Sequence, residues 1–585
     1  MKHTLSYIEG HPRPQFTRRA FISLDGEWDF CFDEKNCGKA DRFYRDFPAK
    51  PRKIRVPYAY QSEASGIGEE RKCDVVWYRK RTKVSVPAGK RALLHFEGAD
   101  YLAEVWINGA FVGSHKGAYA RFTFDISEYL SGEDAEIVVR CEDTESCAQP
   151  RGKQKWEARP FGCWYTETTG IWKSVWLEYV GKSYLERAKI TADISDYSAR
   201  FEYDIAGFRD DLRLKTRISF NGATVAEDEC AVCRPHFAQT FDLTSETDPF
   251  KKHFWFPHAP ELYDVEYFLY ENGKEIDRAA SYFGLVGYKT EQNNVTVNDY
   301  PVYLKMVLDQ GYFPHGWYTP DEEQIVNDVQ AVRALGLNGV RKHQKIEDER
   351  FYYYCDVLGL YVWLEMPSAF EYSDGAAVEF TAQWLEILRQ YENHPSIMAL
   401  VPFNESWGIP QVFSDLRQQD FSRGVYRLSK ALLPEKLVIS NDGWEHTESD
   451  FVTLHNYAEN GEQLKAVYDS LEDALQNNKT AGVPHKFAFA KGFSYAGQPV
   501  MLSEFAGISF EKDRAKGWGY GEPVKDEQSF LARLSSLVSA VRAEKGFCGY
   551  CITQLTDVQH EINGLFDFQR RCKVDQEKLK RIFSE

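Results

Sequence analysis

The stretch IMALVPFNESWG, residues 397–408, changes character halfway along. Its first part is mostly apolar, which is the pattern of a buried strand, and it runs directly into Asn404 and Glu405. A strand that ends on an Asn-Glu pair places a carboxylate at the edge of a sheet. The kind of sheet, and the partner of this carboxylate, follow from the sequence on either side.

Strand-like and helix-like segments alternate from about residue 290 to the end of the chain. Besides residues 397–401, the strand-like segments are YLKMVLD (303–309), NGVR (338–341), LYVWLE (360–365), KLVIS (436–440), FVTLH (451–455), PVMLSE (499–504) and GFCGYCIT (546–553). Helical patterns lie between them at 347–359, 377–391, 411–432 and 527–543. This alternation predicts a (β/α)8 TIM barrel over residues 288–585.

The first helix of this barrel has a start signal and a stop signal. The sequence TPDE at 319–322 predicts a capping box with Thr319 as the N-cap and Pro320 at the first helical position. Gly336 is a plausible residue for the turn that ends the helix.

The first half of the chain has strand patterns and turn signals without helical periodicity. Asn108-Gly109 separates two apolar runs, and Asn221-Gly222 follows the alternating segment LRLKTRISF (212–220), so both pairs predict hairpin turns. These patterns favour a jelly-roll-like β-sandwich over residues 1–181 and an immunoglobulin-like β-sandwich over residues 182–287.

Composition excludes some classes of function. The 585 residues carry a net charge of −17 with no basic run, which argues against a nucleic-acid partner. The start MKHTLSYIEGHPRP lacks the apolar core of a signal peptide, and no apolar run is long enough for a membrane span. These features predict a cytoplasmic protein with no membrane partner.

Cysteine usage fits the same expectation. Twelve cysteines in a chain of this length indicate reduced thiols. The pairs Cys230/Cys233 and Cys548/Cys551 have the spacing of zinc ligands, but they lie far apart in the sequence, and we interpret them as core cysteines.

Polar residues cluster where the predicted barrel strands end. They are Arg341, His343, Glu365, Asn404, Glu405, Asn441, Asp442, His455, Tyr457 and Glu504. The carboxyl ends of barrel strands face one mouth, so Glu405 and Glu504 are predicted to lie across it from each other. Two facing carboxyl groups can catalyse glycoside hydrolysis, because one protonates the leaving oxygen while the other attacks the anomeric carbon or activates water. We expect one of them to stay protonated near neutral pH.

At this point the chain resembles glycoside hydrolase family 2, the family of bacterial β-galactosidases, β-glucuronidases and β-mannosidases. The resemblance covers nearly the whole chain and rests on SLDGEWDF (23–30), VWINGAFVG (105–113), TGIWKSVWLE (169–178), VRKHQ (340–344), CDVLGLYVWLEMP (355–367) and NHPSIMALVPFNESWG (393–408). It implies a retaining, exo-acting β-glycosidase that works by double displacement on a small-molecule or oligosaccharide glycoside, without a cofactor.

The resemblance also implies roles for five residues. Glu405 would be the acid/base and Glu504, in VMLSEFAG, the nucleophile. Asn404 would hold the sugar 2-hydroxyl, and Tyr457 would orient the nucleophile. Arg341 would lie beneath Glu504 and favour its ionised form.

Other residues are weaker candidates. His343 and His455 are expected to line the site, and Glu365 is either a substrate contact or a buried partner of Arg341. Trp407, like Trp444, either packs under the loops or forms a platform for a sugar. Where the family often has a tryptophan after strand eight, this chain has Thr553, followed by the candidates Gln554 and Asp557.

The departures from the family bear on the substrate. LEMPSAFEYSDG (364–375) has no histidine, so no Mg²⁺ site of the β-galactosidase type, and no other metal site, is expected. The Asn-x-Lys motif that grips glucuronate is absent after strand eight. A neutral sugar of the β-galactoside type is therefore expected, with a β-glucuronide or other uronide as the alternative, in which case Arg570, Arg571 or Lys573 would bind the carboxylate.

Two further points stay open in the sequence. In the family, an aspartate of the first domain often lies in the site, and here Trp164 or Glu167 occupies that region of the sequence.

A catalytically inactive carbohydrate-binding protein or a structural scaffold would be the rival classes, but the first would lack one of the glutamates and the second would need no polar residues at the strand ends. A homo-oligomer is compatible with the sequence.

Overall fold

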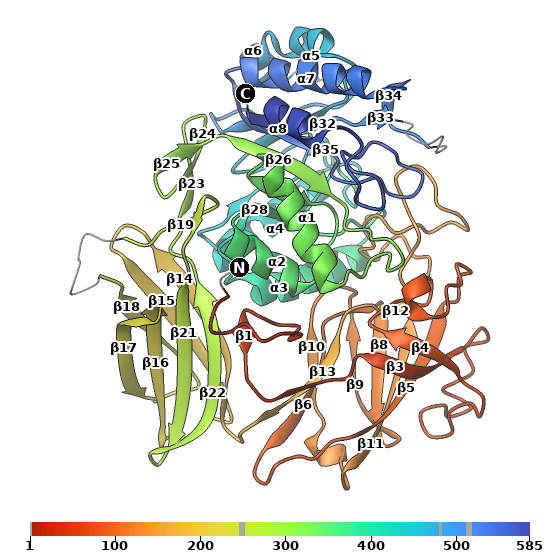
Figure 1. Ribbon diagram of the computed structural model, residues 1–585, viewed down its shortest axis with the longest axis vertical. Helices are drawn as coiled ribbons and strands as arrows, with labels where there is room; N and C mark the ends of the chain where they lie inside the picture. Colours follow the sequence, from red (N-terminus) through yellow and green to blue (C-terminus); the bar gives the residue numbers. More distant parts are fainter. Residues whose placement is uncertain (1–2, 245–251, 479–482, 511–516, 585) are drawn as a thin grey trace.

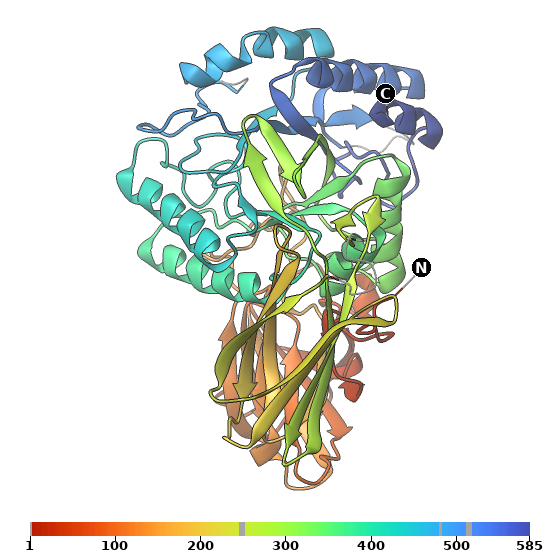
Figure 2. The same cartoon turned by 90° about the vertical axis from the view of Figure 1, so that its left-hand side faces the viewer.

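The structure is a computed structural model that describes residues 3–244, 252–478, 483–510 and 517–584. Two β-sandwiches lie beneath a larger α/β domain, and the two views agree on this arrangement (Figures 1 and 2). The chain ends in α8 (Gln576–Ser584), on the side of the α/β domain away from the sandwiches (Figure 1).

The first sandwich packs two antiparallel sheets around one apolar core. One sheet has the order β10 (Phe122–Asp125), β6 (Arg91–Phe96), β13 (Val175–Val180), β2 (Phe21–Ser23); the other has the order β4 (Arg52–Val56), β3 (Gly26–Phe32), β5 (Val75–Lys83), β11 (Asp134–Glu142), β8 (Leu102–Ile107), β9 (Ala110–Lys116). The short strands β7 (Ala99–Asp100) and β12 (Gly170–Ile171) pair beside them. The predicted hairpin is confirmed, since Asn108 and Gly109 have φ of 50° and 77°.

The second sandwich also has two sheets. One contains β14 (Tyr184–Asp193), β15 (Ser198–Ala206) and β18 (His236–Asp242); the other has the order β1 (Phe16–Thr17), β22 (Lys274–Phe283), β21 (Tyr263–Glu271), β16 (Leu212–Phe220), β17 (Ala223–Ala231). Phe16 pairs with Ser281, so this N-terminal strand joins the second sandwich although the sequence groups it with the first. The predicted turn at Asn221-Gly222 connects β16 to β17.

The α/β domain is the predicted TIM-like barrel. Its parallel sheet contains eight strands: β26 (Leu304–Asp309), β27 (Gly339–Lys342), β28 (Tyr361–Glu365), β29 (Ile397–Val401), β30 (Leu437–Val438), β31 (Val452–Asn456), β32 (Val500–Ala506) and β35 (Phe547–Thr553). Their spatial order follows the chain around the curled sheet, with β26 beside β35. The amide of Val438 donates to the Asp450 carboxylate, and the amide of Asp450 donates to the Val438 carbonyl, which ties β30 to the segment that enters β31.

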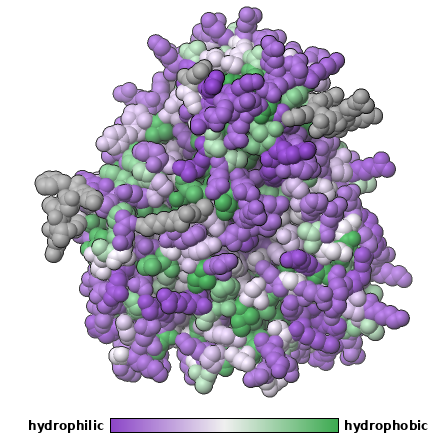
Figure 3. Space-filling view, viewed as in Figure 1, coloured by the Kyte–Doolittle hydropathy of each residue, from purple (hydrophilic) through white to green (hydrophobic). Residues whose placement is uncertain are grey.

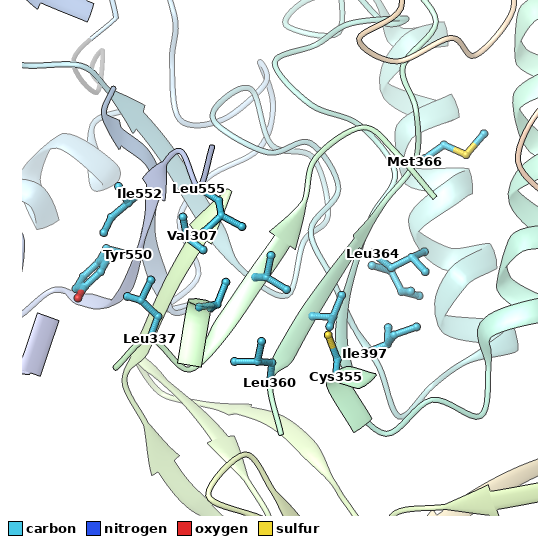
Figure 4. Packing of buried hydrophobic residues seen from close by; sticks show 14 of the residues in the cluster. Val307, Leu337, Cys355, Leu360, Leu364, Met366, Ile397, Tyr550, Ile552 and Leu555 are labelled. Carbon is cyan, nitrogen blue, oxygen red and sulfur yellow. The ribbon is translucent and has the colours of Figure 1, made fainter. Parts of the chain in front are cut away.

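Helices pack around the curled sheet. They are α1 (Glu322–Ala334), α2 (Glu349–Leu358), α3 (Asp374–Tyr391), α4 (Leu416–Leu432), α5 (Gly461–Tyr468), α6 (Leu471–Gln476), α7 (Glu527–Ala543) and α8. Figure 4 shows the apolar core that joins the strands to these helices, for example Val307, Leu364 and Ile397. Small strands flank the barrel: β23 (Tyr288–Glu291), β24 (Asn294–Val297), β25 (Tyr300–Val302), β33 (Ile508–Phe510) and β34 (Tyr520–Val524), besides β19 (Trp255–Phe256) and β20 (Ala259–Pro260) near the second sandwich.

The predicted capping box of α1 is wrong by two residues. The N-cap is Asp321, whose side chain accepts from the amide of Gln324 while the Gln324 side chain accepts from the amide of Asp321. Thr319 instead donates its hydroxyl to the carbonyls of Pro57 and Trp172. The threonine therefore anchors the barrel to the first sandwich. Gly336, with φ of 80°, follows the helix as predicted.

The interpretation of the cysteines holds for one pair only. Cys548 and Cys551 are buried in β35, whereas Cys233 is exposed, so the core interpretation is wrong for that residue. The reason is that Cys233 lies just after β17, which is an edge strand of its sheet.

Hydrophilic side chains cover most of the face in Figure 3, with hydrophobic residues in small patches. In the described part of the chain, no helix has the length and apolar character that crossing a membrane requires.

Candidate functional site

The carboxyl ends of the barrel strands bring the predicted residues together. Arg341 is in β27, Glu365 ends β28, and Glu405 follows β29. His455 and Glu504 are register partners on the adjacent strands β31 and β32. The barrel topology therefore gathers residues that are more than 160 positions apart, such as Arg341 and Glu504, at one edge.

Arg341 is the centre of the site and is fully buried. Its guanidinium lies 2.6 Å from Glu365, 2.6 Å from Asp442 and 3.0 Å from Glu504. It also donates to the side-chain oxygen of Asn404 at 2.8 Å. One cation thus fixes the predicted nucleophile and the predicted sugar-binding amide relative to each other. Of the two alternatives for Glu365, the structure supports the buried partner of Arg341.

Glu504 has a second fixed contact on its other oxygen. The Tyr457 hydroxyl donates to Glu504 Oε2 at 2.5 Å and lies 3.1 Å from Thr553 Oγ1. The Tyr457 ring stacks on Tyr520 of β34 with ring centroids 3.4 Å apart. With Arg341 on one oxygen and Tyr457 on the other, the carboxylate of Glu504 has little rotational freedom.

Glu405 is positioned by its backbone and by His455. Its φ is 51°, and its amide donates to the carbonyl of Asp442 at 2.9 Å. His455 Nδ1 lies 2.8 Å from Glu405 Oε1, and His455 Nε2 lies 2.6 Å from Asp442 Oδ2. Oxygens of Glu405 and Glu504 and a ring nitrogen of His455 all lie within 4.8 Å of one another. The two glutamates therefore face each other across one small space.

The charges in this group are strongly coupled. Burial alone would lower the pKa of His455, but the carboxylates of Glu504 and Asp442, with the hydrogen bond to Glu405, raise it to about 10. Burial raises the pKa of Glu405, but the hydrogen bond and charge of His455 outweigh this effect and shift it downward. His455 therefore favours the ionised form of Glu405, and the expectation that one of the two glutamates stays protonated near neutral pH stays a prediction.

The other predicted site residues differ in their contacts. His343 is buried with Nδ1 3.1 Å from Glu365 Oε1, and burial together with the charge of Arg341 holds its pKa well below the usual range. Trp407 packs edge-on against Trp164 and Phe370, with centroids 5.6 Å and 5.3 Å away.

Gln554 and Asp557 lie outside the group around Arg341. Gln554 accepts from Gln310 at 2.9 Å and donates to Asn563 at 2.7 Å. Asp557 pairs with Lys573 at 2.5 Å and accepts from the amide of Gly564. These contacts give Asp557 a structural role in the loop after β35.

The three cations predicted as an alternative clamp have acidic partners. Arg570 lies 3.2 Å from Asp328, Arg571 lies 2.7 Å from Asp567, and Lys573 pairs with Asp557. Each of these charges is already compensated within the chain.

The first sandwich contributes residues to this region, and the sequence did not indicate all of them. Trp164 contacts Trp407, whereas Glu167 pairs with Lys155 at 2.6 Å, so Trp164 is the one of the two alternatives that reaches the mouth. Tyr165 donates its hydroxyl to Glu561. Lys153 of the same sandwich donates to the thiol of Cys163 at 3.2 Å. Asp442 was visible in the sequence as a strand-end acid, but nothing there indicated its contact with Arg341.

Glu405, His455 and Glu504 are also a group that could hold a metal ion, judged by distance among the described residues. Both ring nitrogens of His455 face carboxylate oxygens, and the pKa of about 10 keeps the ring protonated. An imidazolium has no free lone pair for a metal. The donor set in this charge state therefore does not fit a metal.

Comparisons with known proteins identify both sandwiches. Residues 21–177 match the model "Glycosyl hydrolases family 2, sugar binding domain", and residues 183–285 match the model "Glycosyl hydrolases family 2". These ranges correspond to the two sandwiches of the structure.

Relatives extend the similarity into the barrel. A putative beta-glucuronidase of Formosa agariphila is 26% identical over 428 residues, which is 68% of this chain and 48% of that protein. A beta-galactosidase of Thermoanaerobacter pseudethanolicus is 26% identical over 377 residues, covering 61% of this chain and 47% of that protein. The chain thus spans about half the length of these curated relatives. The structure of a Lactobacillus rhamnosus beta-glucuronidase superposes with a TM-score of 0.79 at 19% identity, over 98% of this chain and 97% of that one, which shows the shared fold.

Proposed function

Because the chain belongs to glycoside hydrolase family 2, we propose that it is a retaining, exo-acting β-glycosidase that works by double displacement. The observation that carries the proposal is the facing pair of Glu405 and Glu504, whose oxygens lie within 4.8 Å. Retaining enzymes hold their two carboxyl groups about 5–5.5 Å apart, since the second one attacks the sugar directly.

In the first step, Glu504 attacks the anomeric carbon, and the glycosidic oxygen leaves with a proton from Glu405. His455 supports this role because its Nδ1 lies 2.8 Å from the Glu405 carboxylate and can pass its proton there. Arg341 and Tyr457 hold Glu504 in the attacking orientation. In the second step, Glu405 takes a proton from water, which attacks the glycosyl-enzyme and releases the sugar with its configuration retained.

A second class, a catalytically inactive carbohydrate-binding protein, has less support. Such a protein has no need for the contacts that orient Glu504 from both sides. The test is a screen of aryl β-glycosides with the wild-type protein and Glu504→Gln. We expect turnover by the wild type, no turnover by the folded variant, since an amide cannot act as the nucleophile, and the retained anomer as the first product by NMR. The inverted anomer would overturn the mechanism.

The sugar has two candidates. The expected neutral sugar of the β-galactoside type rests on the absent Asn-x-Lys motif, and it gains support from the acidic partners of Arg570, Arg571 and Lys573. The alternative is a uronide, whose carboxylate needs a cation from elsewhere. Named relatives include both a beta-galactosidase and a putative beta-glucuronidase. The first sandwich supplies a cation that bears on this choice.

A further inference from the structure

A loop of the first sandwich brings Lys153 to the mouth of the barrel. The amide of Gly152 donates to the carbonyl of Ser368, just beyond β28, at 3.0 Å. A Cβ atom at Gly152 would lie 2.3 Å from the carbonyl oxygen of Gln344, so only glycine allows this close approach. On the other side, the amide of Tyr165 donates to the carbonyl of Lys153 at 2.8 Å. The position of Lys153 is therefore fixed by both domains.

The ammonium of Lys153 is buried and has a weak partner. The residue is 6% exposed, and its Nζ donates to the thiol of Cys163 at 3.2 Å. Among the residues that the structure describes, no salt bridge to a carboxylate is found for it, whereas Lys155, two positions along, pairs with Glu167 at 2.6 Å. A buried cation costs several kcal/mol unless an anion compensates it. Lys153 is thus a buried cation that pairs directly with no carboxylate among the described residues.

Lys153 belongs to the electrostatic field of the catalytic pair. Burial lowers its pKa, but the charges of Cys163, Glu561, Glu405 and Glu504 outweigh that effect and raise it, so the lysine stays charged. In return, Lys153 is one of the charges that lower the pKa of Glu405. The ammonium therefore acts on the same space that the sugar would occupy.

One cation of the site has no directly paired carboxylate. Arg341 pairs with Asp442 and Glu504, and His455 pairs with Asp442 and Glu405. The ammonium of Lys153, in contrast, donates only to the Cys163 thiol among the residues that the structure describes. A carboxylate on the substrate would give this buried ammonium a direct ionic partner.

We propose, resting on the glycosidase function above, that Lys153 binds the carboxylate of a terminal uronic acid, so that the preferred substrate is a β-uronide. The carboxylate of a uronic acid is three bonds from the anomeric carbon, so its binding group must lie in the same mouth as the nucleophile. The sandwich thus completes the sugar site of the barrel. The competing role, in which Lys153 and Glu561 bind hydroxyls of a neutral sugar, is distinguished by the test.

The experiment measures kcat/KM of the wild type, Lys153→Met and Arg571→Gln on aryl β-glucuronide, β-galacturonide, β-galactoside and β-glucoside. We expect the wild type to prefer one uronide at least tenfold. Lys153→Met should lose about 100-fold more on that uronide than on the neutral glycosides, because truncating one partner of a buried charge pair has an effect of this order, whereas the loss of its field on Glu405 acts equally on both classes. Arg571→Gln removes an exposed cation that already pairs with Asp567 and should behave as the wild type.

Preference for a neutral glycoside, or an equal loss of Lys153→Met on both classes, would overturn the proposal while leaving the glycosidase function intact. Absence of turnover on all four substrates would count against the proposed function instead. Calorimetric binding of free glucuronate and galacturonate, against glucose and galactose, tests Lys153 without turnover. The proposal would also be refuted if the wild type did not bind uronates, or if folded Lys153→Met bound them as tightly as the wild type. If Lys153→Met does not fold, Lys153→Gln takes its place in both measurements.

Discussion

His455 lies between two acids and is hydrogen-bonded to the predicted acid/base, with Nδ1 2.8 Å from Glu405 Oε1. The opposite ring nitrogen lies 2.6 Å from Asp442. The imidazole is therefore held in a fixed orientation and keeps a proton that Glu405 can receive. In the proposed mechanism, the acid/base function is therefore a property of the His455–Glu405 pair.

Glu405→Gln should slow glycosides with poor leaving groups far more than activated aryl glycosides. Proton donation contributes roughly 10²–10⁴-fold and matters least when the leaving group needs no proton. The measurement is kcat/KM over a series of aryl glycosides with leaving groups of different pKa. Equal losses across the series would contradict the acid role of Glu405.

Tyr457→Phe should lower kcat at least tenfold with a smaller change in ground-state binding, because a hydroxyl that orients the nucleophile acts mainly in the transition state. Thr553→Val is the matched control. It removes the 3.1 Å contact between the Tyr457 hydroxyl and Thr553 but leaves the hydrogen bond from that hydroxyl to Glu504 in place. Its effect should be the smaller one. A raised KM with unchanged kcat for Tyr457→Phe would make Tyr457 a binding residue.

His455 should make the stability of the protein depend on pH. Its pKa in the folded protein is about 10, above the ordinary 6.5, so its stabilising contribution is complete below pH 6.5 and is lost as pH rises towards and through 10. In His455→Gln this loss should disappear, and the melting temperatures of variant and wild type should converge between pH 6.5 and 10.

His446→Gln is the control for that comparison. Burial lowers the pKa of His446 to about 4, so this histidine is neutral over the same range. Its substitution should displace the melting curve by an amount that does not vary with pH. Parallel pH profiles for wild type and His455→Gln would show that His455 is not held as a cation.

Asp321→Ala should weaken the first turn of α1 by about 1 kcal/mol, the usual effect of losing an N-cap. Hydrogen exchange of the Gln324 amide reports this locally, because that amide donates to the Asp321 side chain. Asp321→Asn keeps an acceptor and should restore most of the protection. Unchanged exchange in Asp321→Ala would contradict the observed cap.

The sequence determined the architecture and the facing pair of glutamates proposed to react. Local signals such as the turn at Asn108-Gly109 and the alternation of strands and helices depend on neighbouring residues, and a barrel then requires strand-end groups such as Glu405 and Glu504 to share one mouth. The sequence did not determine the position of the cap, because Thr319 and Asp321 are both residue types that can cap a helix, and the contact of Thr319 with the first sandwich leaves Asp321 as the N-cap.

Only the tertiary structure decided the charges and the contribution of the sandwich. The proton on His455 follows from acids on neighbouring strands, and the pairing of Lys573 with Asp557 follows from the path of one loop. The residues next to Lys153 in the sequence do not indicate its role, because its charge acts on Glu405 only where the first sandwich meets the barrel. Electrostatic interactions depend on distance in space and on burial, and the order of residues along the chain specifies neither of them directly.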